Sequence, residues 1–369
     1  MELPIYQTEE DALLVCPDGW TVSKAEDAFE KLPTGRIWER KELLCDGTVP
    51  VLDQSLADTL GFHRDEAGVS ASPESPVVTF ANHTCAMRLV IRPFSVIQNV
   101  FPLVGRPAKT DTRFLLYWLN RRVHIEEYKG HFPDLRRLWF PLPPLAEQRA
   151  IAGVLGALDD KIESNRRTRE IVDQYLLAEY LGRHRPDWVS VRLGDCADLL
   201  PGKFLDKAHY GESGTYPVLG SNSEMGWTET PLYDGELICL ARIGSNFGAV
   251  RLCLNGAWIN NNASAIRAKS GFDLLSVFYF LKTFDFGSIR RGSGQPFLAH
   301  NDVENLELRL PLVKDRDNLM ELGRVLSRRA ELAQQESRVL RNVRDALLPE
   351  LLSGRLRVSD AEKAVEGAL

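Results

Sequence analysis

The sequence predicts an α+β protein in which two β-rich domains with packed helices are separated by two long helices that pair as an antiparallel coiled coil. Three observations lead to this fold class. Short segments of the first half recur in the same order in the second half, and β-prone runs alternate with loops rich in Gly, Asn and Ser. Two long stretches also carry apolar residues at alternating spacings of four and three, which is the spacing of a coiled-coil seam. A chain of 369 residues has the length expected of about two domains.

A degenerate internal repeat relates the two halves. Four anchors recur: Trp20 as Trp188, residues 50–52 as 217–219, residues 117–119 as 279–281, and residues 140–142 as 310–312. Their offsets are 168, 167, 162 and 170 residues, so the anchors stay in order with only a small drift. A repeat of this length indicates a duplicated domain, because the units of a solenoid have roughly 20–50 residues.

Each long helix follows a proline hinge. Pro143 and Pro144 end a β-like stretch before the first helix, and Pro311 lies in a similar position before the second. Polar residues fall near the middle of both seams, which favours antiparallel pairing and places Arg169 near Glu336. The alternative is that each long helix lies alone on its own domain. The seam residues are Ile151, Leu155, Leu158, Ile162, Asn165, Arg169, Val172 and Leu176, and then Leu319, Leu322, Leu326, Arg329, Ala333, Glu336, Leu340, Val343 and Leu347.

The second half has the clearest strand pattern. Residues 216–219, 236–242 and 248–253 are short β-prone runs, with a hairpin expected around Gly244. Residues 272–284 have apolar side chains at helical spacing and predict one amphipathic helix packed against the sheet. The expected order is a first domain at 1–144, a central helix at 145–183, a second domain at 184–312, a C-terminal helix at 313–357 and a tail at 358–369.

Charge and apolar runs limit the classes of function. The net charge of −6 counts modestly against a protein that coats DNA, because non-specific affinity comes from neutralised phosphates. Much of the acid lies near the N-terminus, whereas several arginines lie in expected loops and strand ends. The apolar runs are shorter than the roughly 18 residues that a membrane span needs. The first residues also lack the basic start and the apolar stretch of a signal peptide, so we expect a location in the cytoplasm.

Motifs for catalysis and for metal binding are scarce. The chain has no P-loop, no His-Glu-x-x-His motif, no Gly-x-Gly-x-x-Gly turn and no adenine-methyltransferase motif. Asp111 with Glu127 and Lys129 resembles the arrangement of metal-dependent nucleases, which could hold a magnesium ion. The alternative is that Asp111 caps the helix that follows it. The six cysteines are scattered without Cys-x-x-Cys spacing, so we expect reduced thiols and no metal site.

A resemblance to a known family rests on residues 142–151, which read LPPLAEQRAI, and on Leu158-Asp159 and 161–163 after them. This segment resembles the central conserved region of type I restriction-modification specificity (S) subunits, and the resemblance extends from Gly19 to Val358. It implies two target-recognition domains, each of which reads one part of a bipartite DNA site. It also implies an antiparallel helical spacer that docks methyltransferase subunits, and no catalysis by this chain.

The resemblance also implies the partners. They are double-stranded DNA, two methyltransferase (M) subunits, and a restriction/translocase (R) subunit in the complexes that cleave DNA. S-adenosylmethionine, ATP and magnesium are expected on those partner subunits, in a prokaryotic cytoplasm, with no cofactor in this chain. Two alternatives stay open. The first alternative is a coiled-coil interaction scaffold whose domains no longer read DNA. The second is a specificity protein of another DNA-modification defence system.

Candidate DNA-binding residues are polar side chains in the expected loops. Base reading needs donors and acceptors in fixed geometry, such as Arg for guanine and Asn or Gln for adenine. Each loop taken alone is more often a solvated turn, and the resemblance to a DNA-reading family is what favours the binding role. A departure from the family pattern affects the first half, because the counterpart of residues 292–295 is only residues 129–131. The second-half candidates are Ser221, Asn222, Arg242, Ser245, Asn246, Asn261, Arg290, Arg291, Ser293 and Gln295, and the first-half candidates are Gln54, Ser55, Asn82, His83, Lys129 and His131, with Gln98 and Asn99 in a further loop.

Overall fold

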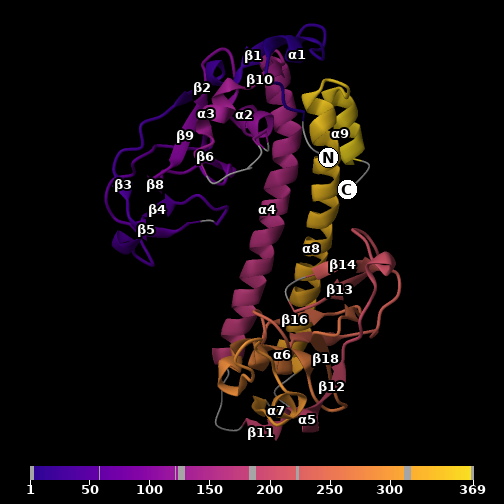
Figure 1. The fold of residues 1–369 in the computed structure, drawn as a ribbon. Helices are drawn as coiled ribbons and strands as arrows, with labels where there is room; N and C mark the ends of the chain where they lie inside the picture. The colour runs from indigo at the N-terminus through magenta and orange to yellow at the C-terminus, as the bar shows by residue number, and fades with distance from the viewer. Residues whose placement is uncertain are drawn as a thin grey trace. The chain divides into compact units, whose positions relative to one another are not determined.

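The computed structural model describes residues 4–57, 59–120, 122–123, 129–182, 188–221, 224–310 and 317–366. Contacts divide the chain into two compact units. The first unit consists of Met1–Ser164 with Glu336–Leu369, and the second consists of Asn165–Gln335. Each unit contains its own sheets and its own part of both long helices (Figure 1). The two units are described one after the other.

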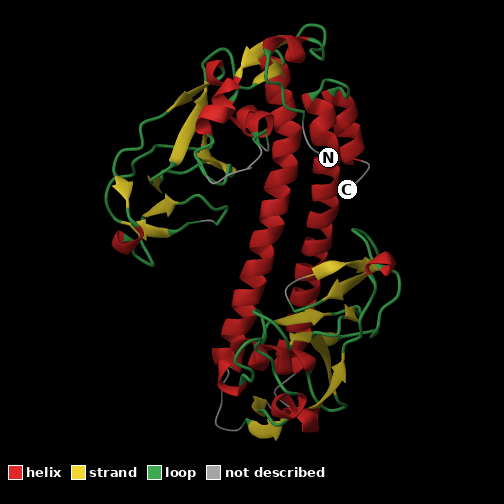
Figure 2. Cartoon of the chain, viewed as in Figure 1, coloured by secondary structure: helices red, strands yellow, loops and turns green. Residues whose placement is uncertain are grey.

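The first unit has sheets with the orders β2-β9-β6-β7, β3-β8-β4-β5 and β1-β10 among its described residues (Figure 2). Its strands are β1 Thr21–Lys24, β2 Phe29–Lys31, β3 Ile37–Trp38, β4 Val49–Leu52, β5 Gly61–His63, β6 Val77–Ala81, β7 Met87–Val90, β8 Ser95–Ile97, β9 Val100–Gly105 and β10 Trp139–Leu142. Its helices are α1 Glu9–Leu13, η1 Ala25–Asp27, η2 Arg40–Glu42, α2 Thr112–Leu119, α3 Phe132–Arg137 and α9 Val358–Glu366, together with parts of α4 Leu145–Gly182 and α8 Asp317–Leu352.

The second unit has sheets with the orders β12-β18-β15-β16, β14-β13-β17 and β11-β19 in the part of the chain that is described. Its strands are β11 Val189–Arg192, β12 Ala197–Pro201, β13 Tyr216–Leu219, β14 Glu224–Thr228, β15 Leu237–Ala241, β16 Val250–Cys253, β17 Trp258–Ile259, β18 Ala263–Ala268 and β19 Glu307–Leu310. Its helices are α5 Leu193–Cys196, η3 Lys207–His209, α6 Leu274–Thr283, η4 Phe286–Ile289 and α7 His300–Glu304, with the remaining parts of α4 and α8. The strands at 216–219 and 250–253 and the hairpin between β15 and β16 confirm the expected strand pattern.

The strand orders confirm the internal repeat. The order β2-β9-β6-β7 of the first unit matches β12-β18-β15-β16 of the second, and β8-β4-β5 matches β17-β13-β14. One anchor needs a correction. Thr21 pairs with Leu142 and Val189 pairs with Leu310, so Leu142 is equivalent to Leu310 rather than to Leu312. Strand register decides this equivalence, whereas the sequence alignment rests on two similar Pro-Leu pairs.

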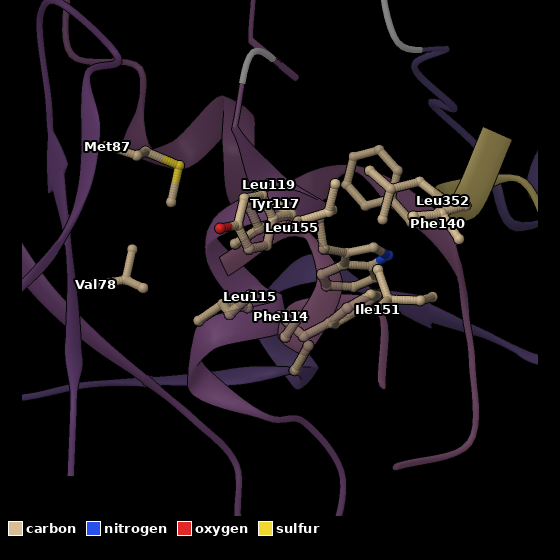
Figure 3. Packing of buried hydrophobic residues seen from close by; sticks show 14 of the residues in the cluster. Val78, Met87, Phe114, Leu115, Tyr117, Leu119, Phe140, Ile151, Leu155 and Leu352 are labelled. Carbon is tan, nitrogen blue, oxygen red and sulfur yellow. The ribbon is translucent and has the colours of Figure 1, made fainter. Parts of the chain in front are cut away.

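The core of the first unit forms where α2 and the start of α4 pack against the β2-β9-β6-β7 sheet (Figure 3). The Asp111 carboxylate accepts hydrogen bonds from the N–H groups of Arg113 and Phe114, at 2.9 and 3.0 Å, and thereby caps α2. Phe114 and Leu155 are fully buried in the cluster. Asp111 therefore acts as the helix cap that the sequence offered as the alternative to a metal ligand.

The second unit has the same kind of core. Helix α6 packs against β15, β16, β18 and β19, which confirms the amphipathic helix expected at 272–284. Its cap is Asp273, whose carboxylate accepts a hydrogen bond of 2.7 Å from the Ser276 N–H. Phe278 and Tyr279 are buried, so these aromatic side chains serve packing.

Helices α4 and α8 pack together in antiparallel orientation. In the first unit, Leu155 of α4 shares a core with Leu340 near the C-terminal end of α8. In the second unit, Leu176 of α4 shares a core with Leu326 near the N-terminal end of α8. This confirms the expected pairing.

Two details of the seam differ from expectation. The expected seam residue Leu322 is 42 % exposed, and the buried position is the next residue, Gly323, where a Cβ would lie 3.0 Å from Leu275 of α6. At this position α8 faces α6 as well as α4, whereas the expected seam residues Ala333, Leu340 and Leu347 are buried. Glu336, which was expected near Arg169, forms its ion pair with Lys161 at 3.3 Å.

Residues 358–366, expected to be part of a tail, form helix α9. Ala361 is fully buried in the core of the first unit, and Val358 and Val365 pack against the same core. The apolar spacing of these three residues matches a helical period, so a short amphipathic helix could have been recognised there.

Candidate nucleic-acid interface

Four loops of the second unit meet around the side chain and carbonyl group of Asn262. The Asn262 carbonyl oxygen accepts hydrogen bonds from the N–H groups of Arg242 and Ile243, at 3.0 and 3.2 Å, and from the Ser221 hydroxyl at 2.7 Å. The Gly244 N–H donates to the Pro296 carbonyl at 3.1 Å and thereby joins the loop at 290–297. The structure therefore brings together all four second-half loops singled out from the sequence.

Exposure separates the candidates in these loops. Ser221 is only 4 % exposed, and both its N–H and its hydroxyl bond to Asn262, so Ser221 holds the loop in place. Asn222 lies outside the described residues. The exposed candidates are Ser245, Asn246, Asn261, Arg290, Arg291, Ser293 and Gln295.

The two adjacent arginines of the 290–297 loop have different surroundings. Arg291 forms a bidentate ion pair with Asp302, with Nε at 2.6 Å and a terminal nitrogen at 2.7 Å from the carboxylate oxygens. Arg290 is exposed and lies over the Phe247 ring, 5.9 Å from its centroid. Arg291 was a leading candidate from sequence, but its guanidinium already has a partner of opposite charge in this structure.

Arg242 begins the turn after β15 and is partly buried. Its Nε is inaccessible to solvent, and the described residues supply no hydrogen-bond partner for it. Buried donors are normally paired, because an unpaired one loses its hydration without compensation. This donor is therefore the one polar group of the four loops, within the described chain, that the protein leaves buried and unsatisfied.

In the first unit, several candidates belong to one hydrogen-bond network. The His83 N–H donates to Gln54 Oε1 at 3.1 Å, and His83 Nδ1 lies 2.9 Å from the Lys129 carbonyl oxygen. Its Nε2 lies 3.2 Å from the Asn99 side-chain amide nitrogen. Because a carbonyl oxygen only accepts and an amide nitrogen only donates, we assign the proton to Nδ1.

Asn82 closes the same network. Its side-chain oxygen accepts a hydrogen bond of 2.9 Å from the N–H of Phe132, the first residue of α3, and its carbonyl oxygen accepts one of 2.8 Å from the His131 N–H. Gly130 is required nearby, because a Cβ there would lie 2.7 Å from the Asn82 amide nitrogen. His131 is 1 % exposed and Asn82 is engaged, so both act mainly in holding the loop.

The remaining first-half candidates lie at the edge of this network. The Ser55 hydroxyl donates to Asp53 at 2.6 Å in a surface turn. The Lys129 ammonium group is exposed and lies 3.6 Å from the Asp134 carboxylate. Both Ser55 and Lys129 are exposed.

A cavity of about 350 Å³ opens beside the network. It is lined by side chains from three loops, among them Arg40, Gln54, Gln98 and Asn99. These are residue types that bond to phosphates or base edges.

Trp38, which lines the cavity, belongs to an aromatic stack. Trp38 stacks on His63 at 4.0 Å between ring centroids, and the Arg36 guanidinium covers the Trp38 ring at 4.0 Å. Burial lowers the pKa of His63, which keeps the imidazole neutral next to the arginine. Trp38 was missed in the sequence, although the run Arg36-Ile37-Trp38 interleaves charge and aromatic character.

Equivalent main-chain bonds relate the two sites. The Asn82 N–H donates to the Asn99 carbonyl at 2.9 Å, and the Arg242 N–H donates to the Asn262 carbonyl at 3.0 Å. The Asn82 carbonyl oxygen accepts a hydrogen bond from the His131 N–H at 2.8 Å. The Arg242 carbonyl oxygen accepts one from the Leu298 N–H at 2.9 Å. Residues 129–131 are therefore equivalent to 296–298, not to 292–295 as the sequence indicated. Asn82 and Arg242 occupy the same position in the two units.

Features of other protein classes were also sought. Within the described residues, no group of three or more His, Cys, Asp or Glu side chains is placed to hold a metal ion. Glu127, the second acid of the nuclease-like arrangement, lies outside those residues. Among the helices that the structure describes, none combines the length and the apolar character needed to cross a bilayer.

Comparisons with known proteins agree on one family. A family model described as Type I restriction modification DNA specificity domain matches residues 17–173 and 186–334. The putative type I restriction enzyme MjaX specificity subunit of Methanocaldococcus jannaschii is 24 % identical over 319 residues, which cover 72 % of this chain and 74 % of the relative. The MjaIX specificity subunit of the same organism is 23 % identical over 319 residues, covering 71 % and 72 %.

A solved structure shares the fold. The crystal structure of the type I restriction-modification S subunit from M. genitalium superimposes with a TM-score of 0.62 at 18 % sequence identity, covering 90 % of this chain and 96 % of that one. At this identity the likeness concerns the fold alone, and it confirms the expected arrangement of two α+β domains and two long helices.

Proposed function

The chain belongs to the family of type I restriction-modification DNA specificity subunits, and from this premise we propose that each unit reads one part of a bipartite DNA site. The observation that carries the proposal is the pair of equivalent loop platforms. Both are built by the same main-chain bonds, yet they present different side chains at equivalent positions. A duplicated scaffold with different exposed side chains suits the reading of two different short sequences.

In this proposal, the DNA contacts come from the exposed loop residues of each unit. In the second unit these are Ser245, Asn246, Asn261, Arg290 and Gln295 around Arg242. In the first unit they come from Lys129, Ser55 and the cavity beside Gln54. Ser221, Asn82 and His131 hold these loops in place through their hydrogen bonds.

We further propose that the chain itself performs no catalysis. Methyltransferase subunits, two per complex, would bring S-adenosylmethionine, and a restriction/translocase subunit would bring ATP and magnesium. The long helices are the proposed docking surface for the methyltransferases. Ile171 of α4 and Val325 of α8 support this, because they are 64 % and 61 % exposed although they are apolar.

The first test is to identify the modified sequence. The full chain would be co-expressed with candidate methyltransferase subunits, and modified bases would be mapped by sequencing. We expect two short specific parts separated by unspecified bases. Modification at a single continuous site, or none with a correctly assembled complex, would contradict the proposal and favour a scaffold role.

A domain exchange would assign the parts. Replacing residues 188–310 with those of another family member should change only one part of the site. The control is the reciprocal exchange of residues 19–142. If one exchange altered both parts, the assignment of one unit to one part would be wrong.

A helix insertion would test the spacer. Four extra residues in each long helix, placed between 164 and 165 and between 335 and 336, add about one turn while preserving the antiparallel pairing. The unspecified gap should lengthen, and both specific parts should stay the same. An unchanged gap in a folded, active complex would exclude the helices as the element that sets the spacing.

A further inference from the structure

We propose that Arg242 is the residue through which the second unit reads a guanine base. The inference rests on the proposed function and adds to it a specific residue and a specific base. It also moves the role of base reader away from Arg291, which the sequence favoured equally.

The main chain of Arg242 is held on both sides. Its N–H donates to Asn262 at 3.0 Å, and its carbonyl oxygen accepts from the Leu298 N–H at 2.9 Å. The strand β15 precedes it directly, and Gly244 with φ of +103° turns the chain away after it. These bonds fix the point from which the side chain starts, which accurate base reading requires.

The side chain of Arg242 is unsatisfied. Its Nε is buried and has no acceptor among the described residues, while the residue as a whole stays partly accessible. Arginine keeps its charge at any accessible pH and presents five donors in a planar fork. In the major groove, guanine offers the two acceptors O6 and N7, which match that fork. Nε itself is inaccessible to solvent, so the terminal nitrogens of this partly accessible side chain would donate to the base.

The adjacent candidate Arg291 lacks this property. Both oxygens of Asp302 engage the Arg291 guanidinium. At the equivalent position of the first unit, the Asn82 side-chain oxygen bonds to the start of α3 at 2.9 Å. The shared platform thus carries a structural amide in the first unit and an unpaired guanidinium in the second.

The test uses the full chain with its methyltransferase partner and duplexes that carry the mapped site. In the part assigned to the second unit, each guanine would be replaced in turn by 7-deazaguanine, which lacks the N7 acceptor. Affinities would be measured for the wild type, Arg242→Ala, Arg242→Lys and the control Arg291→Ala. Melting temperatures would confirm that each variant is folded.

We expect one guanine whose replacement by 7-deazaguanine weakens DNA binding by the wild type. The same replacement should leave the DNA affinity of Arg242→Ala unchanged. Arg242→Ala itself should bind the native site roughly 5- to 150-fold more weakly, the range for a lost bidentate base contact. Arg291→Ala should remain sensitive to 7-deazaguanine. If Arg242→Ala does not fold, the comparison of wild type with Arg242→Lys replaces it, because lysine keeps the charge and loses the fork.

Three results would overturn the inference. The first is that the part of the DNA site assigned to the second unit contains no guanine, or that 7-deazaguanine there does not weaken wild-type binding. The second is an Arg242→Ala protein as sensitive as the wild type. The third is a loss of affinity in Arg242→Ala that is equal on all DNA sequences and is restored in Arg242→Lys. That result would indicate a phosphate contact. Failure of the proposed function is distinguishable, because then the wild-type complex would modify no bipartite site at all.

Discussion

Gln148 ties the first turn of α4 to the loop before α2, and its replacement should destabilise the first unit strongly. The side chain is fully buried. Its amide nitrogen donates to the carbonyl groups of Lys109 and Pro143, at 2.9 and 2.8 Å, and its oxygen accepts from the Asp111 N–H at 2.9 Å. Only an amide can donate twice and accept once at this place. This gives a physical reason for the glutamine of the LPPLAEQRAI segment.

The magnitude follows from these three bonds. Gln148→Leu keeps a similar volume but removes all three, and it leaves three main-chain groups without their partner. At about 1–1.5 kcal/mol for each bond, the free energy of unfolding should fall by roughly 3–5 kcal/mol. For a unit of this size, each kcal/mol lowers the melting temperature by about 2–4 °C, so the expected decrease is roughly 6–20 °C.

A second substitution at the same position adds a pH signature. In Gln148→Glu the new carboxyl group is buried beside two carbonyl oxygens, and burial raises the pKa of a carboxyl group. The folded state then holds the proton more tightly than the unfolded state. The variant should therefore be closest to the wild type at low pH and lose stability as the pH rises above about 4.3 towards the folded-state pKa.

Differential scanning calorimetry between about pH 4 and pH 8 would measure both effects. The matched control is Gln7→Leu, because Gln7 is exposed. Melting temperatures within about 2 °C of the wild type for both Gln148 variants would refute the reasoning. So would a Gln148→Glu protein that becomes more stable, relative to the wild type, as the pH rises.

Two further predictions use other buried groups. Tyr117→Phe removes a hydrogen bond of 2.7 Å to the Asp159 carboxylate and should lower the free energy of unfolding by about 1.5–3 kcal/mol in urea titrations, whereas Tyr175→Phe on the exposed face should change it little. An equal effect of the two substitutions would count against the hydrogen bond. Cys45 is exposed, whereas burial raises the pKa of Cys239 to about 12, so a thiol reagent at pH 8 should label Cys45 first. The order of labelling would be read by mass spectrometry. Labelling of Cys239 before Cys45 would contradict the prediction and show that the core around β15 opens readily.

The sequence by itself determined the architecture and the family. Each repeat anchor, such as those at Trp20 and Trp188, is a short local segment. The strand pattern and the coiled-coil spacing are also local, so all three can be recognised without knowledge of the fold. Asp111 as a helix cap was recognisable for the same reason. Loop residues able to bond to bases were also recognisable, but only as residue types.

The tertiary structure alone decided which of those residues are available. Asn82 holds α3 through a residue 50 positions away, and the ion pair of Arg291 with Asp302 and the buried unpaired donor of Arg242 likewise depend on how the loops fold. The burial of Gly323 in place of Leu322 depends on a third helix, α6, that the heptad pattern does not contain. Periodicity encodes which face of an element is buried, whereas the identity of the hydrogen-bond partner is set only when distant loops meet.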